Sequence, residues 1–274
     1  NPNARNLKKY ETILSGFIGY DALGNERRNE TVVEMQDNTL LDGCIVEKGE
    51  RDNIKGIDSS FILTNCIVKN NTEIGLFCKN GNLTVQWCEI SNNGSYGIYH
   101  FNTDYNNYDL TVQNSKITEN QQNGIYVNAT IPAILNCEIS FNGSSGNYYG
   151  INLLNPPSNP LIRNCTIVHN VNEGIRYSGA SQFRPDVRNC ILFANNADDD
   201  YMDISGFSNT WYCCLTDPNH LEGPPLADPP TDGQGNMRTY PGFAYPDSSY
   251  RNFHLAADSP CIDAGDPDEQ AYVR

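Results

Sequence analysis

Residues that could bind a sugar polymer recur along the chain, directly after the isoleucine or leucine of a short repeated strand. These positions are Asp58, Phe77, Tyr99, Tyr126, Asn152, Arg176 and Ser205. Aromatic faces stack on sugar rings, and an arginine can bind a carboxylate through two parallel hydrogen bonds. We therefore predict that Phe77, Tyr99, Tyr126, Asn152 and Arg176 bind a long acidic glycan. The alternative is that the rings only stabilise a sheet, or that loops cover them.

A repeat of 22 to 28 residues must position these side chains. One position of each repeat serves as its reference, and we call it the anchor. An aliphatic residue stands three positions before the anchor, and another stands two positions after it. The anchors are Cys44, Cys66, Cys88, Ser115, Cys137, Cys165, Cys190 and, by a weaker match, Cys213. A period in this range indicates a solenoid. Residues two apart share one face of a strand, so the anchor and the second aliphatic residue are expected to point inward.

An asparagine follows six of the anchors by five residues, and a second short strand beginning with glycine comes after it. Asparagine suits turns because it tolerates left-handed backbone and bonds locally, and stacked copies can also bond to each other. No helical periodicity is present. We therefore predict coils that stack into parallel sheets. A leucine-rich repeat has an overlapping period, but it would need more leucine and usually a helical or looser convex segment.

The Asn-Cys-x-Ile and Gly-Ile pattern, as in 164–167 and 124–125, resembles the right-handed parallel β-helix proteins of the pectate-lyase-like superfamily. The segment 253–267 resembles the closing motif of secreted bacterial β-helix proteins that often carry a surface anchor, and 12–16 resembles an early coil. The resemblance implies an all-β, right-handed parallel β-helix of roughly eight coils with irregular terminal segments. It also implies a secreted or cell-surface bacterial protein, joined to other domains of a longer anchored chain.

Periodicity divides the chain into two parts. Residues 1–216 are predicted to form the β-helix with its N-terminal end coils. Residues 217–274 are rich in proline and glycine and should pack on the last coil or extend from it. Extra residues near 102–108, 144–149 and 155–158 predict loops on the solenoid surface, where function commonly lies. The ending at 266–269 looks cut short, so we expect the gene product to continue.

The superfamily resemblance implies two kinds of catalysis. A polysaccharide lyase needs a base near the sugar C5 proton and a group that neutralises the uronate, such as Arg, Lys or Ca²⁺. Tyr99 or Tyr126 could then act as base or acid, with Arg176 as neutraliser. His100 is adjacent, but strand alternation points it inward. Lys116 is expected on another face, in a charge ladder with Glu89 and Glu138.

A glycoside hydrolase needs two carboxylates at a suitable separation. The densest acidic group is 198–200 together with Asp203. Residues Asn102-Thr103-Asp104 resemble one polygalacturonase motif, but the paired-Asp and Gly-His-Gly motifs of those enzymes are absent. Asp199, Asp200 and Asp203 are candidate Ca²⁺ ligands, because Ca²⁺ binds several oxygens. The alternative is a solvated acidic loop. Ca²⁺ is the one cofactor that the sequence suggests.

Charge and cysteine use narrow the class of partner. A net charge of −15 argues against nucleic acid, whose phosphates need a basic surface. No segment is long and apolar enough for membrane insertion. Seven of the ten cysteines occupy the anchor position and are expected to be buried core thiols. A bridge among Cys78, Cys214 and Cys261 is possible, but the sequence does not assign it.

Two functions remain open. The first is a secreted carbohydrate-active protein that binds, and in an enzymatic form cleaves, a polysaccharide in lyase-like or glycosidase-like chemistry. The second is a non-catalytic cell-surface or extracellular-matrix module with a structural or adhesive role. The first requires an exposed stripe of binding residues, and the second predicts that this stripe is flat or covered. The fold alone does not choose between them.

Overall fold

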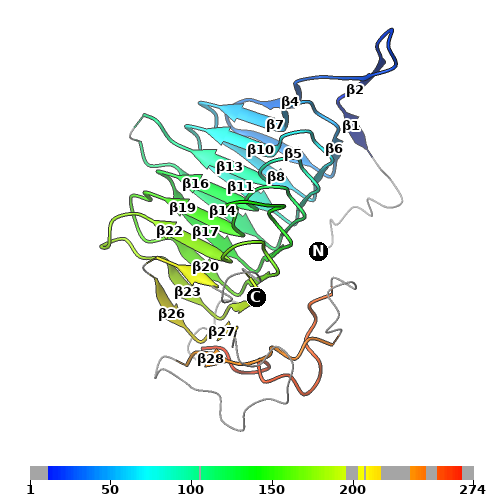
Figure 1. Ribbon diagram of the computed structural model, residues 1–274. Coiled ribbons are helices and arrows are strands. Elements are labelled where there is room, and N and C mark those ends of the chain that lie inside the picture. The colour runs from blue at the N-terminus through cyan, green and yellow to red at the C-terminus, as the bar shows by residue number, and fades with distance from the viewer. Residues whose placement is uncertain are drawn as a thin grey trace.

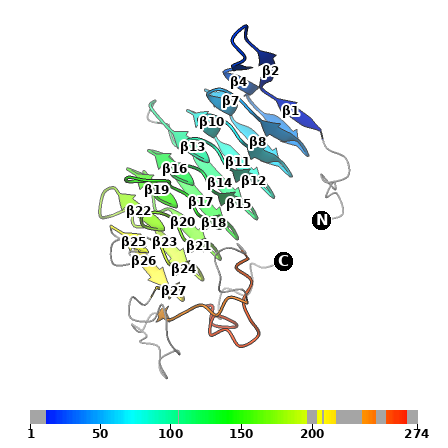
Figure 2. The same cartoon turned by 45° about the vertical axis from the view of Figure 1, so that its right-hand side comes forward.

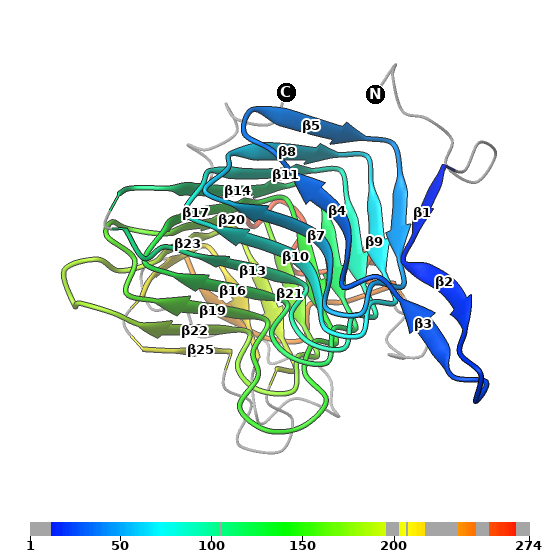
Figure 3. The ribbon, with the colours of Figure 1, turned by 90° about the horizontal axis from the view of Figure 1, so that it is seen from above.

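Three parallel sheets wrap around one narrow core in the computed structural model, which describes residues 12–104, 106–195, 203–206, 208–216, 235–244 and 252–266. Seen from above, each coil passes once through every sheet (Figure 3). The coils stack from the N-terminal end at the top to the C-terminal end at the bottom (Figure 1). The structure is a parallel β-helix of about eight coils without helices in the described ranges, which confirms the predicted fold class.

We name the sheets by their outward surfaces. The aromatic sheet contains β4 (Thr31–Met35), β7 (Asp52–Ile57), β10 (Ile74–Lys79), β13 (Ile98–Phe101), β16 (Ile125–Asn128), β19 (Ile151–Leu154), β22 (Ile175–Ser178) and β25 (Ile204–Ser205). The charged sheet contains β1 (Ile13–Ser15), β6 (Ile45–Glu47), β9 (Ile67–Lys69), β12 (Glu89–Ser91), β15 (Lys116–Thr118), β18 (Glu138–Ser140), β21 (Thr166–Val168), β24 (Ile191–Phe193), β27 (Cys214–Leu215) and β28 (Met237–Arg238).

The third sheet precedes the charged sheet in every coil. It contains β5 (Thr39–Asp42), β8 (Phe61–Thr64), β11 (Leu83–Gln86), β14 (Asp109–Gln113), β17 (Ile131–Leu135), β20 (Leu161–Arg163), β23 (Asp186–Arg188) and β26 (Asn209–Trp211). A separate antiparallel hairpin, β2 (Phe17–Tyr20) and β3 (Glu26–Arg28), projects from the N-terminal end (Figure 2).

Stacked asparagines hold the turn between the charged and aromatic sheets. The side-chain amide of each donates to the side-chain carbonyl of the next, from Asn93 to Asn120, Asn142, Asn170 and Asn195, at 2.9–3.0 Å. All five are buried. The left-handed backbone lies one residue earlier, as at Asn92 and Phe141, so the ladder asparagines act through bonding. The predicted asparagine ladder is confirmed.

Glycine opens the aromatic strands because this ladder passes so close. A Cβ atom built on Gly97 would lie 2.7 Å from Nδ2 of Asn120, and one on Gly124 would lie 2.7 Å from Nδ2 of Asn142. Any larger residue would push the ladder out of register. The recurring Gly-Ile pair thus follows from packing between two neighbouring elements.

The anchor thiols form the predicted inward ladder. From Cys66 onward they are buried, and each donates to the carbonyl two residues before it, for example Cys66 to Thr64 and Cys165 to Arg163 at 3.2 Å. Ser115 replaces one thiol and makes the same contact with Gln113 at 2.8 Å. Because a thiol and a hydroxyl can both donate to this carbonyl, the serine fits into the repeat.

Candidate functional site

The predicted binding residues lie in one column on the outer side of the aromatic sheet. Phe77 pairs with Tyr99, Tyr99 with Tyr126, Tyr126 with Asn152, and Asn152 with Arg176. Ser205 continues the column after Arg176. Neighbouring strands are about 4.8 Å apart, so the five side chains form a stripe along the solenoid axis. The structure therefore brings together all five residues that the sequence singled out for substrate binding.

Asp58 does not belong to this stripe. Strand pairing places Lys55 beside Phe77, and Glu34 beside Lys55. The pair Gly56-Ile57 looks like the later Gly-Ile pairs, but its glycine makes room for a ring, since a Cβ there would lie 2.2 Å from Cε1 of Phe61. The prediction for the coil that contains β7 was therefore wrong by three residues.

Two further rings join the stripe and were not predicted. Phe101 lies two residues after Tyr99, and their rings stack at a centroid distance of 5.1 Å. Tyr96 reaches in from the preceding turn, 5.0 Å from Tyr99 and 5.4 Å from Tyr126. Phe77 meets Tyr99 edge to face at 5.7 Å. Period-two alternation could have found Phe101, whereas Tyr96 belongs to a turn and gave no strand signal.

Positive charge gathers on this face although the chain is acidic. Two columns of described side chains point outward on this face: the stripe itself, and the residues two positions further along each strand. In these two columns the cations are Lys55, Lys79 and Arg176, and the only carboxylate is Glu34. The three cations make no ion pair with any described residue. Lys79 lies 5.7 Å from the centre of the Phe101 ring. The face therefore offers unneutralised cations beside aromatic rings.

Tyr149 fixes the arginine of the stripe. The Nη1 atom of Arg176 donates to the Tyr149 hydroxyl at 2.7 Å, and the guanidinium lies 5.0 Å from the ring centre. Burial raises the pKa of Tyr149, with the carboxylate of Glu173 raising it further and Arg176 opposing. The phenol stays neutral, so it orients the guanidinium without cancelling its charge.

Asn152 carries an unused acceptor. Its side chain is only 8% exposed, and its Oδ1 atom has no hydrogen-bond partner. A buried polar group without a partner costs free energy, typically about 1–3 kcal/mol. In the stripe it lies between Tyr126 and Arg176. This oxygen is sealed from solvent, so it marks a local cost within the stripe and not a contact point for a ligand.

The tyrosines predicted as base or acid are held in their neutral form. Burial raises the pKa of Tyr99, and burial followed by the nearby Tyr99 raises the pKa of Tyr126. A general base needs a pKa near the working pH, so this shift runs opposite to that role. The hydroxyls of Tyr96, Tyr99 and Tyr126 make no hydrogen bond within the described residues, which leaves them available to donate to a ligand.

His100 points inward, as predicted from strand alternation. It is fully buried beside Cys78 and Val127. Its Nε2 atom donates to the carbonyl of Gly81 at 2.8 Å, and its Nδ1 atom accepts from the Thr130 hydroxyl at 2.9 Å. Burial lowers the pKa of His100 to about 4. The ring is a neutral core residue that supports the aromatic sheet from behind.

Of the proposed calcium ligands, Asp199 and Asp200 lie outside the described residues. Asp203 is buried and ends the asparagine ladder: its Oδ1 atom accepts from Asn195 at 2.9 Å, and its Oδ2 atom accepts from the backbone of Thr216 at 2.6 Å. Burial raises the pKa of Asp203 to about 6. Within the described ranges, no three His, Cys, Asp or Glu side chains gather closely enough to hold a metal ion.

A second surface lies over the charged sheet. Two hollows, of about 470 and 660 Å³, share Lys116, Asn136 and Glu138. Trp87 lines the larger hollow, and His254 of the C-terminal segment lines the smaller. Lys116 pairs in register with Glu89 and Glu138, and its Nζ atom lies 2.8 Å from Oε1 of Glu138. The predicted charge ladder is present, and it forms the floor of a groove that the sequence did not reveal.

Comparison with known families agrees with this architecture. A family model described as the right-handed β-helix region matches residues 24–109 and 88–211. The chain belongs to the right-handed β-helix family. Searches of curated proteins and of solved structures found no significant match. No described helix could span a membrane. The β-helix match covers the coils, while the pectate-lyase-like superfamily and the anchor-type ending remain predictions.

Proposed function

We propose that this β-helix protein binds an acidic polysaccharide along its aromatic face, outside the cell and without cleaving it. The observation that carries the proposal is the column of rings, Phe77, Tyr99 and Tyr126, in line with the Arg176 guanidinium that Tyr149 orients. A pyranose face can stack on the aromatic cluster, and a uronate can pair with the guanidinium.

The charge pattern supports an acidic ligand. The whole chain carries 33 acidic and 18 basic side chains, so its average field repels a polyanion. Lys55, Lys79 and Arg176 reverse this sign locally, and none of them is paired with a described carboxylate. Binding should therefore be local to this face and weaken with salt, because exposed charges are screened within about 8 Å at physiological ionic strength.

Binding without cleavage fits the protonation states of the site. Tyr99 and Tyr126 have raised pKa values through burial, so neither is a ready base at neutral pH. In the two outward columns Glu34 is the only carboxylate, whereas glycoside hydrolysis needs a pair. The residues of the stripe are therefore assigned to recognition: the rings to stacking and Arg176 to a carboxylate.

Calorimetric titration with polygalacturonate, alginate and chondroitin oligosaccharides, and with neutral glucans, tests the proposal. We expect an acidic oligosaccharide to bind, Arg176→Gln and Tyr126→Ala to weaken it, and Trp87→Ala on the charged face to leave it unchanged. The same samples are assayed for unsaturated uronates and for new reducing ends, with and without Ca²⁺. Either product would replace binding with lyase or hydrolase activity, and absence of binding throughout the panel would overturn the proposal for these glycans.

The unbroken ladders favour a second candidate, a structural or adhesive module. Five buried asparagines bond in series, and anchor thiols repeat in nearly every coil. Such regularity stiffens a solenoid regardless of what its faces bind. This function predicts that Arg176→Gln and Trp87→Ala behave alike with every glycan, which the same titrations measure.

A further inference from the structure

Two adjacent cysteines in the last coil point to opposite sides of the charged sheet. Cys213 is an anchor thiol, fully buried in the core. Cys214 is the next residue and pairs in register with Ile191 and Met237, in the outward column of the sheet. Side chains alternate along a strand, so only one of the two can join the inward ladder. Cys214 is buried all the same, because the C-terminal segment covers it.

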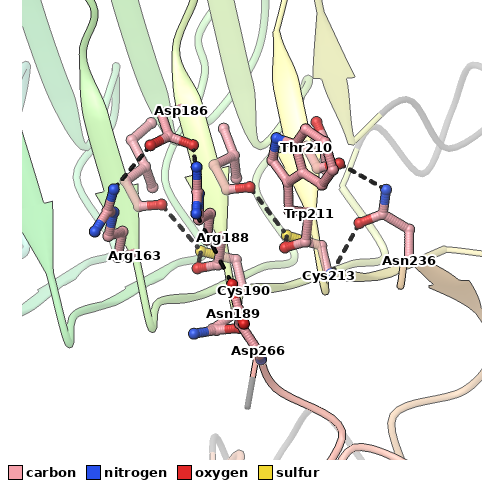
Figure 4. A network of polar contacts seen from close by, with 12 residues as sticks. Arg163, Asp186, Arg188, Asn189, Cys190, Thr210, Trp211, Cys213, Asn236 and Asp266 are labelled. Carbon is pink, nitrogen blue, oxygen red and sulfur yellow. Dashed lines mark hydrogen bonds and ion pairs between the residues drawn. The ribbon is translucent and has the colours of Figure 1, made fainter. Parts of the chain in front are cut away.

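That segment returns to the solenoid through specific contacts. The backbone N–H of Asp266 donates to Oδ1 of Asn189 at 2.8 Å, and the Asp266 carboxylate lies 3.8 Å from Nη1 of Arg188 (Figure 4). Arg188 in turn binds Asp186 at 2.8 Å, which also binds Arg163. Earlier in the segment, Phe243 and Phe253 pack in a cluster with Phe193 and Val168. These contacts fix where 252–266 lies on the outer surface.

The result is a thiol pair. The Cys214 and Cys261 thiols lie close enough that each is the largest influence on the pKa of the other. They line the same cavity of about 100 Å³, together with Tyr212 and Met237. Cys214 also donates to the carbonyl of Thr239 at 3.4 Å, and Cys261 is partly exposed. One thiol is thus sheltered and the other is reachable from solvent.

We propose that Cys214 and Cys261 are the redox pair of this protein and form a disulfide that closes the C-terminal segment onto the last coil. The oxidant is a disulfide donor, either oxidised glutathione or an oxidoreductase with a disulfide. Cys261 loses its proton and attacks one donor sulfur, which breaks the donor disulfide and releases one thiolate. Cys214, deprotonated in turn, attacks the Cys261 sulfur and releases the second thiolate. Two protons and two electrons leave the pair, and the donor is reduced to two thiols.

Electrostatics agrees with that order of attack. Interaction with the neighbouring Cys214 thiol holds the pKa of Cys261 below its ordinary value, although burial opposes this. Interaction with Cys261, together with burial, raises the pKa of Cys214. The thiolate is the reactive form, so the partly exposed Cys261 is the first nucleophile.

The anchor ladder is a matched contrast within the same chain. Its thiols also have sulfur neighbours, but parallel in-register strands hold them about 4.8 Å apart, whereas bridged Cβ atoms lie about 3.8 Å apart. Each is committed to a carbonyl two residues earlier, as at Cys190 and Cys213. From Cys66 onward they are buried, although Cys190 also lines the cavity of the pair. Cys78, also fully buried, donates to the carbonyl of Gly81 and lies within the core.

The bridge would tie one wall of the charged-face groove to the solenoid. Asn252, Phe253 and His254 line that groove together with Lys116 and Glu138. They lie in the segment that Cys261 would hold. This inference stands independently of the polysaccharide proposal, because it concerns the other face and uses none of the stripe residues.

Peptide mapping of the full chain tests the bridge. The protein is incubated with oxidised and reduced glutathione mixtures, alkylated, denatured and digested with trypsin without reduction. Arg238 and Arg251 separate the two thiols, so 189–238 and 252–274 part unless a disulfide joins them. We expect a linked pair with the mass loss of two hydrogen atoms, absent after reduction. Cys261 is the single cysteine of 252–274, so its partner can be assigned.

Matched variants identify the partner among Cys190, Cys213 and Cys214, which share one peptide. Cys214→Ser should abolish the link, and Cys213→Ser should retain it. A link that persists in Cys214→Ser, or an alkylated free Cys261 in wild-type protein under oxidising conditions, would overturn the proposal. The wild-type mapping needs no variant to fold. Amide exchange at Ala244 and Ala256, which bond within the segment, should rise at least tenfold on reduction of the wild-type protein.

Discussion

The aromatic and charged sheets share the same coils but meet solvent in different ways. On the aromatic face, rings and unpaired cations lie in register, and Asn152 keeps an unused acceptor. On the charged face, Lys116 is already paired with Glu138, and the C-terminal segment forms a wall. The comparison shows that a hollowed surface can already have its charged side chains paired. The aromatic face holds cations that have no ion-pair partner among the described residues.

Lowering the pH should destabilise the aromatic sheet through His100, and this is the largest effect that we expect. His100 lies behind the aromatic sheet with a folded pKa of about 4. Its unfolded value is about 6.5, so the unfolded chain binds an extra proton as pH falls between them, and stability is lost by up to about 3 kcal/mol. Amide exchange at Ile98 and Ile125, corrected for intrinsic rates, should accelerate over this range.

His100→Gln is the control for this prediction, because glutamine can donate and accept without titrating in the range. The variant should lose most of the acid sensitivity of the aromatic sheet. Two groups leave a residual slope: burial lowers the pKa of His169, which adds to the loss in acid, and burial raises the pKa of Asp203 to about 6, which opposes it. The difference between wild type and His100→Gln therefore isolates the contribution of His100. An unchanged pH profile in His100→Gln would contradict the buried neutral state of His100.

Removing the stripe guanidinium should have the next largest effect. Arg176→Gln keeps a hydrogen-bond donor but loses the charge, and charge-assisted hydrogen bonds contribute about 2 kcal/mol, or roughly 30-fold in affinity. Lys116→Gln is the matched change on the charged face and should leave glycan affinity unchanged. Titration with an acidic oligosaccharide at two salt concentrations measures both, and equal losses would erase the difference between the faces.

A smaller change separates stacking from hydrogen bonding. Tyr99→Phe keeps the ring, which contacts Phe77 and Tyr126, and deletes only the hydroxyl. We expect a loss of about 1 kcal/mol in glycan binding, since a neutral hydrogen bond contributes about 0.5–1.5 kcal/mol. Tyr99→Ala should lose more. If the two variants bind equally, the ring face makes no contact with the ligand.

The smallest effect belongs to the ion pair of the charged face. Lys116 and Glu138 are both partly exposed, and exposed pairs contribute about 0–1 kcal/mol. A double-mutant cycle with Lys116→Ala and Glu138→Ala, followed by chemical denaturation, should give a coupling energy in this range. A coupling energy above it would show that the charged face stores more interaction energy than its exposure suggests.

Much of the coil architecture could be predicted from the sequence because every coil solves the same packing problem. Anchor thiols, ladder asparagines and the Gly-Ile pair recur at fixed offsets, and these offsets place Tyr99, Tyr126 and Arg176 on one face. The coil that contains β7 departs from these offsets. Its pair Gly56-Ile57 has the same residue types as the later Gly-Ile pairs, but Gly56 makes room for the ring of Phe61. Local resemblance gave the wrong register where long-range packing decided it.

The rest depended on contacts that no period encodes. Tyr96 enters the stripe from a turn, and Tyr149 meets Arg176 across a long insertion. Cys214 and Cys261 come together because a non-repeating segment folds back over the charged sheet. Asp203 was predicted as a cation ligand from the acidic run, yet its oxygens continue the asparagine ladder. In each case two residues are in contact although the repeat does not fix the number of residues between them.

The most direct test compares two double variants in one titration with the tightest-binding acidic oligosaccharide. Tyr99→Ala with Arg176→Gln removes one stacking ring and the guanidinium at the end of the aromatic stripe, and Trp87→Ala with Lys116→Gln alters the groove on the charged face. The first should abolish measurable binding, and the second should bind as wild type does. Loss of binding in the second variant, with the first unaffected, would place the ligand in the groove and contradict the account.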